Sequence, residues 1–174
     1  MSLVFQYGSN TSAQRLNSPE RLNGAAKVIS SAYTNNLYEL DFTVWSKTNK
    51  CAAADIVPDG KTQIWGVLYE IPDNLIYREL SGSRKSLDAV EGEGGNYQRI
   101  EIDVISQNDA NKIISVLTYV VRERSTGLLT SAEYVSEVLS GLSSHDIPKT
   151  YVAYVHKRIL LNNGSLSDKL PEIA

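Results

Sequence analysis

Two short segments of the chain carry residue types suited to oxyanion binding and proton transfer. Tyr7-Gly8-Ser9-Asn10 ends a short apolar stretch, and Glu91-Gly92 follows about half a chain later. A tight turn of glycine and short polar side chains can present backbone N–H donors to a carboxylate or a developing oxyanion. Desolvation in a partly closed pocket raises a glutamate pKa toward the range useful for proton transfer near neutral pH. Together the segments predict an anion-binding turn beside one acid–base group.

Each segment also has an ordinary interpretation. Gly-Ser-Asn is common turn chemistry, and a glutamate at a helix end before a glycine is usually solvated. The chain has no phosphate-binding Gly-x-x-x-x-Gly-Lys-Ser/Thr run, and Ser9 lacks the Gly-x-Ser-x-Gly surroundings of a triad nucleophile. His145 and His156 lack metal-ligand spacing, so we expect them on the surface. We interpret Cys51 as structural.

The composition bounds the class of protein. The chain has 174 residues, 42% of them hydrophobic, which predicts one globular domain with a sizeable core. The net charge of −3 gives no electrostatic footprint for nucleic acid or for an anionic membrane. A single cysteine favours a reducing compartment, and neither a signal peptide nor a membrane span is evident, so we expect a cytoplasmic location.

The elements that must position these residues form an α+β pattern. Residues 25–33 and 37–45 predict one hairpin, and 52–57 and 63–71 predict a second around Pro58-Asp59-Gly60-Lys61. Residues 97–105 are expected to pair with 113–122, with Arg122-Glu123-Arg124 as a solvated strand end. A strand is predicted over 3–7 and a helical turn over 12–16. Helices are predicted to begin at Ser18 and at Pro148 and to span residues 74–80, 84–91 and 131–142, with an interruption over 81–83. We expect one domain over 1–161 and a loose polar tail over 162–174.

Three motifs in order resemble the γ-glutamylcyclotransferases. Tyr7-Gly8-Ser9-Asn10 after a short strand is similar to the N-terminal signature of that family. Ile64-Trp65-Gly66-Val67-Leu68-Tyr69 resembles its middle segment, and Ser86-Leu87-Asp88-Ala89-Val90-Glu91-Gly92 followed by Tyr97 resembles its catalytic segment. Pro148-Lys149-Thr150-Tyr151 is a weaker match to a late proline-tyrosine element. The resemblance covers roughly residues 3–122.

The resemblance implies a fold, an activity and a site. The implied fold is a compact mixed β-barrel surrounded by helices, with a pocket at one side. The implied reaction cyclises a γ-glutamyl compound to 5-oxoproline and releases an amino acid or amine, with no metal and no other cofactor. By position, the catalytic glutamate falls on Glu91 and the substrate-binding turn on Tyr7, Gly8, Ser9 and Asn10. Tyrosines that line the pocket fall on Tyr97, Tyr119 and Tyr151.

The leaving group and the assembly stay open. Tyr-Gly-Ser-Asn resembles the branch that acts on γ-glutamyl amino acids, whereas Glu91-Gly92 with Tyr97-Gln98-Arg99 resembles the branch that acts on γ-glutamyl amines. The expected partner is a small-molecule γ-glutamyl substrate, with no nucleic acid and no membrane, and a homodimer is an open alternative. A protein that binds a ligand without turnover, or an interaction protein with a vestigial pocket, is the competing interpretation.

Overall fold

A computed structural model describes residues 1–82 and 85–172 of the chain. The strands are β1 (Ser2–Gln6), β2 (Lys27–Thr34), β3 (Tyr38–Ser46), β4 (Cys51–Pro58), β5 (Trp65–Ile71), β6 (Tyr97–Ser106) and β7 (Asp109–Val121). The α-helices are α1 (Ala13–Leu16), α2 (Asp73–Ile76), α3 (Leu87–Glu91), α4 (Ala132–Ser143) and α5 (Lys149–Asn162). Short 3₁₀ helices are η1 (Ser9–Thr11), η2 (Arg78–Leu80) and η3 (Gly164–Leu166).

Five strands close into a barrel in the order β1-β5-β2-β6-β7. All neighbours pair antiparallel except β1 and β7, which close the barrel through a parallel contact at Val4 and Leu117. Alternate residues of a strand point to opposite faces, so Val4 and Phe5 of β1 enter two different buried clusters. The barrel therefore buries both faces of its first strand, and the loop that follows β1 is held from two sides.

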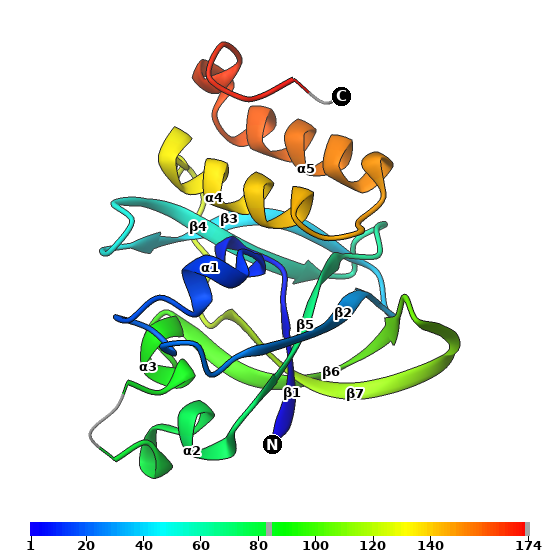
Figure 1. Cartoon of the computed structure of the whole chain (residues 1–174). Helices are drawn as coiled ribbons and strands as arrows, with labels where there is room; N and C mark the ends of the chain where they lie inside the picture. Colours follow the sequence, from blue (N-terminus) through cyan, green and yellow to red (C-terminus); the bar gives the residue numbers. More distant parts are fainter. Residues whose placement is uncertain (83–84, 173–174) are drawn as a thin grey trace.

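A separate two-stranded sheet and two long helices cover one side of the barrel. β3 and β4 pair with each other, and Figure 1 shows α4 and α5 side by side across this hairpin. The apolar side chains of α4 face inward, as the amphipathic pattern of residues 131–142 predicts. The short helices α2 and α3 lie at another edge of the barrel, near the ends of β5 and β6 (Figure 1).

The structure confirms the α+β class and the barrel, but it corrects both predicted N-terminal hairpins. β2 pairs with β5 and β6, not with β3, and β4 pairs with β3, not with β5. Alternation of polar and apolar residues fixes which face a side chain takes but not which strand lies alongside, so local turns suggested the wrong partners. The hairpin of β6 and β7 is confirmed over its whole length.

Gly66 has the close backbone approach that a glycine within a strand suggests. A Cβ atom at this position would lie 2.2 Å from the carbonyl oxygen of Gln6 and 2.8 Å from the ring of Phe5. Only glycine fits there, because β5 packs directly against β1. The contact fixes the end of β1, from which the Tyr7–Asn10 turn starts.

Three further expectations are corrected. The segment after Ser18 forms turns, not a helix. Arg124 is not a solvated strand end, because its Nε donates to the fully buried Asp55 at 2.6 Å. Residues 163–172 are not wholly loose, since Leu166 of η3 is buried in the main core. The predicted boundary between residues 161 and 162 stays a prediction, and residues 83–84 and 173–174, which belong to a predicted helix start and to the tail, lie outside the described residues.

Candidate active site

The tetrapeptide Tyr7-Gly8-Ser9-Asn10 leads from β1 into η1. Tyr7 and Asn10 are buried, and the Tyr7 hydroxyl donates to the carbonyl of Tyr119 at 2.7 Å. The Thr11 N–H donates to the Gly8 carbonyl at 3.1 Å, which closes the turn. The N–H groups of Ser9 and Asn10 donate to no acceptor in the part of the chain that the structure describes. The turn thus keeps two backbone donors for a bound group.

Glu91 is the last residue of α3, and local sequence places it there. The Ser86 side chain caps the start of the helix by accepting a hydrogen bond from the Ala89 N–H. Gly92 ends the helix in the left-handed conformation, at φ 70°, which favours glycine. A cap at each end therefore restricts α3 to five residues and presents Glu91 at its C-terminus.

Asn10 joins the turn to Glu91. Its Nδ2 donates to Glu91 Oε1 at 2.6 Å. Its Oδ1 accepts from Arg21 at 3.3 Å, and its backbone carbonyl accepts from the Tyr69 hydroxyl at 3.0 Å. Because Arg21 can only donate, it orients the Asn10 amide so that the NH₂ group faces the carboxylate. The two segments singled out in the sequence therefore meet directly.

The pKa of Glu91 is raised. Burial is the main cause, because it disfavours the charged carboxylate. The hydrogen bond from Asn10 and the charge of Arg21 act in the opposite direction, and Gln6 and Arg15 add smaller effects of the same sign. Glu91 therefore has a carboxyl group that can hold or release a proton closer to neutrality than an exposed glutamate does.

Two cavities meet at Glu91. The inner cavity, of about 30 Å³, lies beside the tetrapeptide and is lined by Gln6, Tyr7, Gly8, Ser9, Asn10, Ala54, Glu91, Tyr97, Tyr119 and Tyr134. The outer cavity, of about 220 Å³, lies toward the loop after β3. Five residues line both cavities: Ser9, Asn10, Glu91, Tyr97 and Tyr134. Glu91 thus stands at the junction of one small and one larger compartment.

Tyrosine side chains form the wall opposite Glu91. The Tyr97 hydroxyl donates to the Ala54 carbonyl at 2.6 Å, and the Ala54 N–H donates to the Tyr134 hydroxyl at 2.9 Å. Burial raises the pKa of Tyr134 to about 12 and raises the pKa of Tyr97 well above its ordinary value, with the negative charge of Glu91 adding to both. These phenols therefore stay neutral near pH 7 and act in the wall as hydrogen-bonding groups.

The remaining predicted tyrosines have other positions. Tyr119 reaches the inner cavity, but its hydroxyl donates to the buried Asp88 at 2.6 Å. Tyr151 lines neither cavity and packs in the main core beside Tyr154, at a ring distance of 5.7 Å. Tyr151 is on α5, on the far side of the β3–β4 hairpin, so it is separated from Glu91 (Figure 1). The structure therefore does not bring Tyr151 to the cavities at Glu91, and its role in substrate binding stays a prediction.

Four site residues were missed in the sequence. Tyr134 lies within the predicted helix over residues 131–142 and was not singled out, although its hydroxyl marks it as a residue that needs a polar partner. Arg15 and Arg21 follow the tetrapeptide closely and line the outer cavity. Gln6 immediately precedes the tetrapeptide, and its Nε2 is buried with no partner among the described residues. Proximity to the tetrapeptide was the available signal for three of the four.

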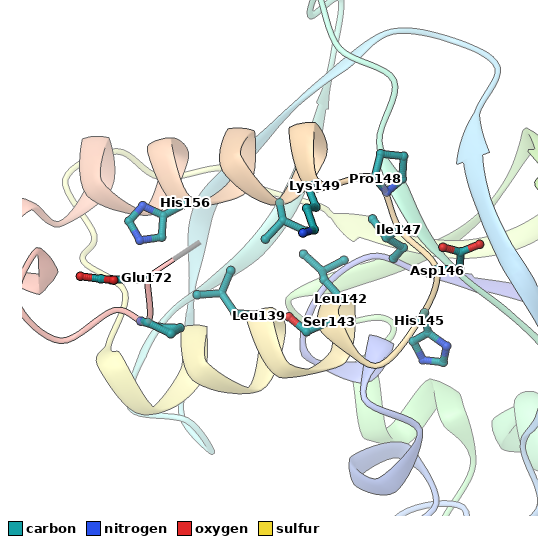
Figure 2. Close-up of a pocket in the computed structure, with 12 residues that line it drawn as sticks. Leu139, Leu142, Ser143, His145, Asp146, Ile147, Pro148, Lys149, His156 and Glu172 are labelled. Carbon is teal, nitrogen blue, oxygen red and sulfur yellow. The ribbon is translucent and has the colours of Figure 1, made fainter. Parts of the chain in front are cut away.

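A larger cavity lies between α4 and α5. It has a volume of about 530 Å³, and Figure 2 shows Leu139 and Leu142 of α4 pointing toward α5, with Lys149 and His156 on the other side. Its lining includes neither Glu91 nor any residue of the tetrapeptide. His145, expected on the surface, is half-buried at its edge, with Nε2 3.0 Å from the carbonyl oxygen of Thr11.

Two further findings concern the described residues only. In residues 1–82 and 85–172, no group of three or more histidine, cysteine or acidic side chains is arranged to hold a metal ion. Over the same residues, no helix is long and apolar enough to cross a membrane.

Comparison with known proteins agrees with the barrel fold. The chain superposes on a solved structure described as a gamma-glutamyl cyclotransferase with a TM-score of 0.74 and 24% identity, over 89% of this chain and 86% of the other. An uncharacterized protein from Homo sapiens gives a TM-score of 0.73 and 25% identity over the same shares. YkqA from Bacillus subtilis gives 0.71 and 22% over 91% of this chain, but only 54% of YkqA is covered. These likenesses establish a γ-glutamylcyclotransferase-like fold.

The model of the AIG2-like family matches residues 63–155, more than half of the chain. The chain therefore belongs to the AIG2-like family. The match includes Glu91 and Tyr97 but begins after the tetrapeptide. No curated protein sequence gives a significant match.

Proposed function

We propose that the protein is a γ-glutamylcyclotransferase that converts a γ-glutamyl amino acid or γ-glutamyl amine to 5-oxoproline and the free amino acid or amine. The observation that carries the proposal is the hydrogen bond between Asn10 and Glu91 at 2.6 Å, inside the cavities that both residues line. It puts one acid–base group beside one turn with free N–H donors. The family membership and the superposed gamma-glutamyl cyclotransferase support the same conclusion.

Glu91 acts first as a base. The α-amine of the substrate is protonated at neutral pH and must lose a proton before its nitrogen attacks the γ-carbonyl carbon. A carboxylate with a raised pKa is a better base than an ordinary glutamate. Attack forms the ring C–N bond and places a negative charge on the carbonyl oxygen. The N–H groups of Ser9 and Asn10 suit that oxygen or the substrate α-carboxylate.

Glu91 then acts as an acid. Its carboxyl group gives the proton to the leaving nitrogen, and the bond from the former γ-carbon to that nitrogen breaks. The Glu91 carboxylate then takes the second proton from the new ring nitrogen, and the released amine accepts it. The products have the same summed composition as the substrate, so no water and no redox partner enter the balance. The reaction is intramolecular, so much of the acceleration comes from holding the substrate chain folded back on itself. The tyrosine wall and the turn are suited to that task.

The test is release of 5-oxoproline from γ-glutamyl-alanine and γ-glutamyl-ε-lysine. We expect the purified protein to convert at least one of them, with the amino acid released in equal amount. The outcome against the proposal is the absence of 5-oxoproline from both substrates. Calorimetric binding of either compound without product would instead identify a binding protein.

A further inference from the structure

We infer that Arg15, Arg21 and Lys47 form a subsite for a carboxylate on the leaving group, so that the enzyme prefers γ-glutamyl amino acids to γ-glutamyl amines. The inference rests on the proposed function and addresses the question that the sequence motifs left open. The three cationic side chains line the outer cavity, where Glu91 is the only acidic residue among the described residues that line it. None of the three lines the inner cavity beside the tetrapeptide.

The arginine side chains at this cavity are bonded to neutral groups. Arg15 donates through Nη2 to Asn49 Oδ1 at 2.8 Å, and Arg21 donates to Asn10 Oδ1 at 3.3 Å. No carboxylate lies within 4.0 Å of either arginine among residues 1–82 and 85–172. Glu91, Glu20 and Glu137 raise the pKa of Arg21 from a greater distance, and of these three only Glu91 lines the cavity. The two arginines are therefore not paired with a carboxylate of the described chain, so an anion can bind to them.

Arg15 also keeps a buried donor without a partner. Its Nε–H is shielded from solvent and hydrogen-bonds to no atom of the described chain. A buried donor without a partner destabilises the fold, and native structures keep few of them. Arg21 has its pKa lowered by burial and by the charge of Arg15, so the two guanidinium groups share one region. A carboxylate bound between the two guanidinium groups would offset this like-charge repulsion.

The junction at Glu91 decides which part of the substrate lies in which cavity. The scissile bond must lie beside Glu91, so the γ-glutamyl part and the leaving group extend to opposite sides of it. The inner side is lined by Gln6, whose Nε2 is unpartnered among the described residues, and by Ser9 and Asn10, which line both cavities and keep free backbone N–H groups. The outer side offers the larger volume and the three cations. A leaving amino acid places its own carboxylate there, whereas a simple amine has none.

The test compares two probes that differ only in that carboxylate. They are γ-glutamyl-alanine and γ-glutamyl-alaninamide, measured for turnover by the wild type and for binding to Glu91→Gln by calorimetry. We expect both kcat/KM and affinity to favour γ-glutamyl-alanine by about 10- to 100-fold, as for a charge-assisted hydrogen bond. Arg15→Gln should remove most of this preference and Arg15→Lys should keep part of it. Lys61→Gln, an exposed change outside the cavity, should leave it intact.

The outcomes separate this inference from the proposed function. Binding to Glu91→Gln with the expected preference, but no 5-oxoproline from the wild type, supports the subsite and contradicts the cyclotransferase. Turnover of both probes at equal kcat/KM supports the cyclotransferase and overturns the subsite. An equal loss on both probes in Arg15→Gln also overturns it, because Arg15 would then hold the γ-glutamyl part. Absence of binding for both probes overturns it as well. Melting temperatures of the Arg15 variants equal to that of the wild type exclude misfolding as the cause.

Discussion

Asp55 and Glu91 are both carboxylates withdrawn from water, but their surroundings differ in kind. Asp55 is fully buried and accepts hydrogen bonds from Thr43 at 2.9 Å, from the Val121 N–H at 3.1 Å and from Arg124 at 2.6 Å. Within the described part of the chain, Glu91 accepts one hydrogen bond, from Asn10, and it lines two cavities. The first carboxylate is fully compensated inside the protein, whereas the second leaves acceptor capacity open to a ligand.

Asp88 sharpens the contrast because it is on the same short helix as Glu91. It is buried and accepts from the Tyr119 hydroxyl, from the Arg78 N–H and from the Arg99 guanidinium. These contacts attach α3 to β6 and β7. One residue of the helix therefore provides its anchor, and another, three positions on, provides the reactive group. Full compensation marks a carboxylate that holds the fold, and partial compensation marks one that can exchange a proton.

The largest expected effect follows from removing the reactive carboxylate. Glu91→Gln keeps an acceptor for Asn10 but can neither take nor return a proton, so we expect kcat to fall by about 100-fold or more. The measurement is 5-oxoproline release at saturating substrate. Glu93→Gln is the control, because its side chain lies two residues away and lines neither cavity. Equal losses in the two variants would contradict a specific role for Glu91.

Removing the compensated carboxylate should act on stability. Asp55→Ala leaves the Thr43 hydroxyl and the Val121 N–H unpaired in the core. Arg124 is 35% exposed and its guanidinium group can turn to water, so the loss of its ion pair contributes less to the destabilisation. We expect a loss of about 3 kcal/mol in the free energy of unfolding, measured by urea denaturation. The control is Asp73→Ala, which removes a half-exposed pair with the N-terminus and should change stability by less than about 1 kcal/mol. Equal losses of stability in Asp55→Ala and Asp73→Ala would contradict this prediction, because the buried contacts of Asp55 would then contribute no more than an exposed ion pair.

Two buried tyrosines extend the comparison to neutral side chains, because one hydroxyl has a hydrogen-bond partner and the other has none among the described residues. Tyr134→Phe leaves the Ala54 N–H unpaired, so we expect a loss of about 1–2 kcal/mol and a lower kcat/KM. Tyr151→Phe is the matched change. The Tyr151 hydroxyl lies near the Trp65 backbone but has no hydrogen bond of acceptable geometry among the described residues. Its removal should leave stability and kcat/KM nearly unchanged. Loss of activity in Tyr151→Phe alone would restore the assignment made from the sequence.

The sequence predicted local features of this molecule better than distant ones. The β6–β7 hairpin was predicted correctly, because polar and apolar residues alternate clearly along β6 and a polar turn joins it to β7. Adjacency alone was not sufficient, since the strands of the β3–β4 hairpin are also adjacent in the chain and their pairing was not predicted. The barrel pairings of β1, β5 and β2 bring together strands far apart in the chain, and alternation alone carries no information about them. The resemblance to a family, and not periodicity, supplied the barrel.

The site divides in the same way. Glu91 and the tetrapeptide were found because contiguous motifs carry them, and the structure brings them within hydrogen-bonding distance. Tyr134 was missed because an aromatic residue at helical spacing is indistinguishable from core until its hydroxyl partner, Ala54, is known. Arg124 was missed for a similar reason, since Asp55 is 69 residues away. Side chains whose roles depend on distant partners need the fold before they can be assigned.

The smallest expected effect concerns the stability cost of the uncompensated carboxylate. The pKa of Glu91 is raised in the folded protein above its unfolded value, about 4.3, so the folded state binds the proton more tightly. Stability associated with this group is therefore fully present below the unfolded pKa and is lost as pH rises through the folded pKa. Glu91→Gln should melt higher than the wild type at pH 7, and the difference should vanish near pH 4. A difference of about 1 kcal/mol in the free energy of unfolding would correspond to a difference of about 2–4 °C in melting temperature at this chain length. Melting curves of both proteins at pH 4, 5, 6 and 7 measure this difference in stability. If the wild type is more stable than Glu91→Gln at pH 7, Glu91 belongs with Asp55 among the compensated carboxylates.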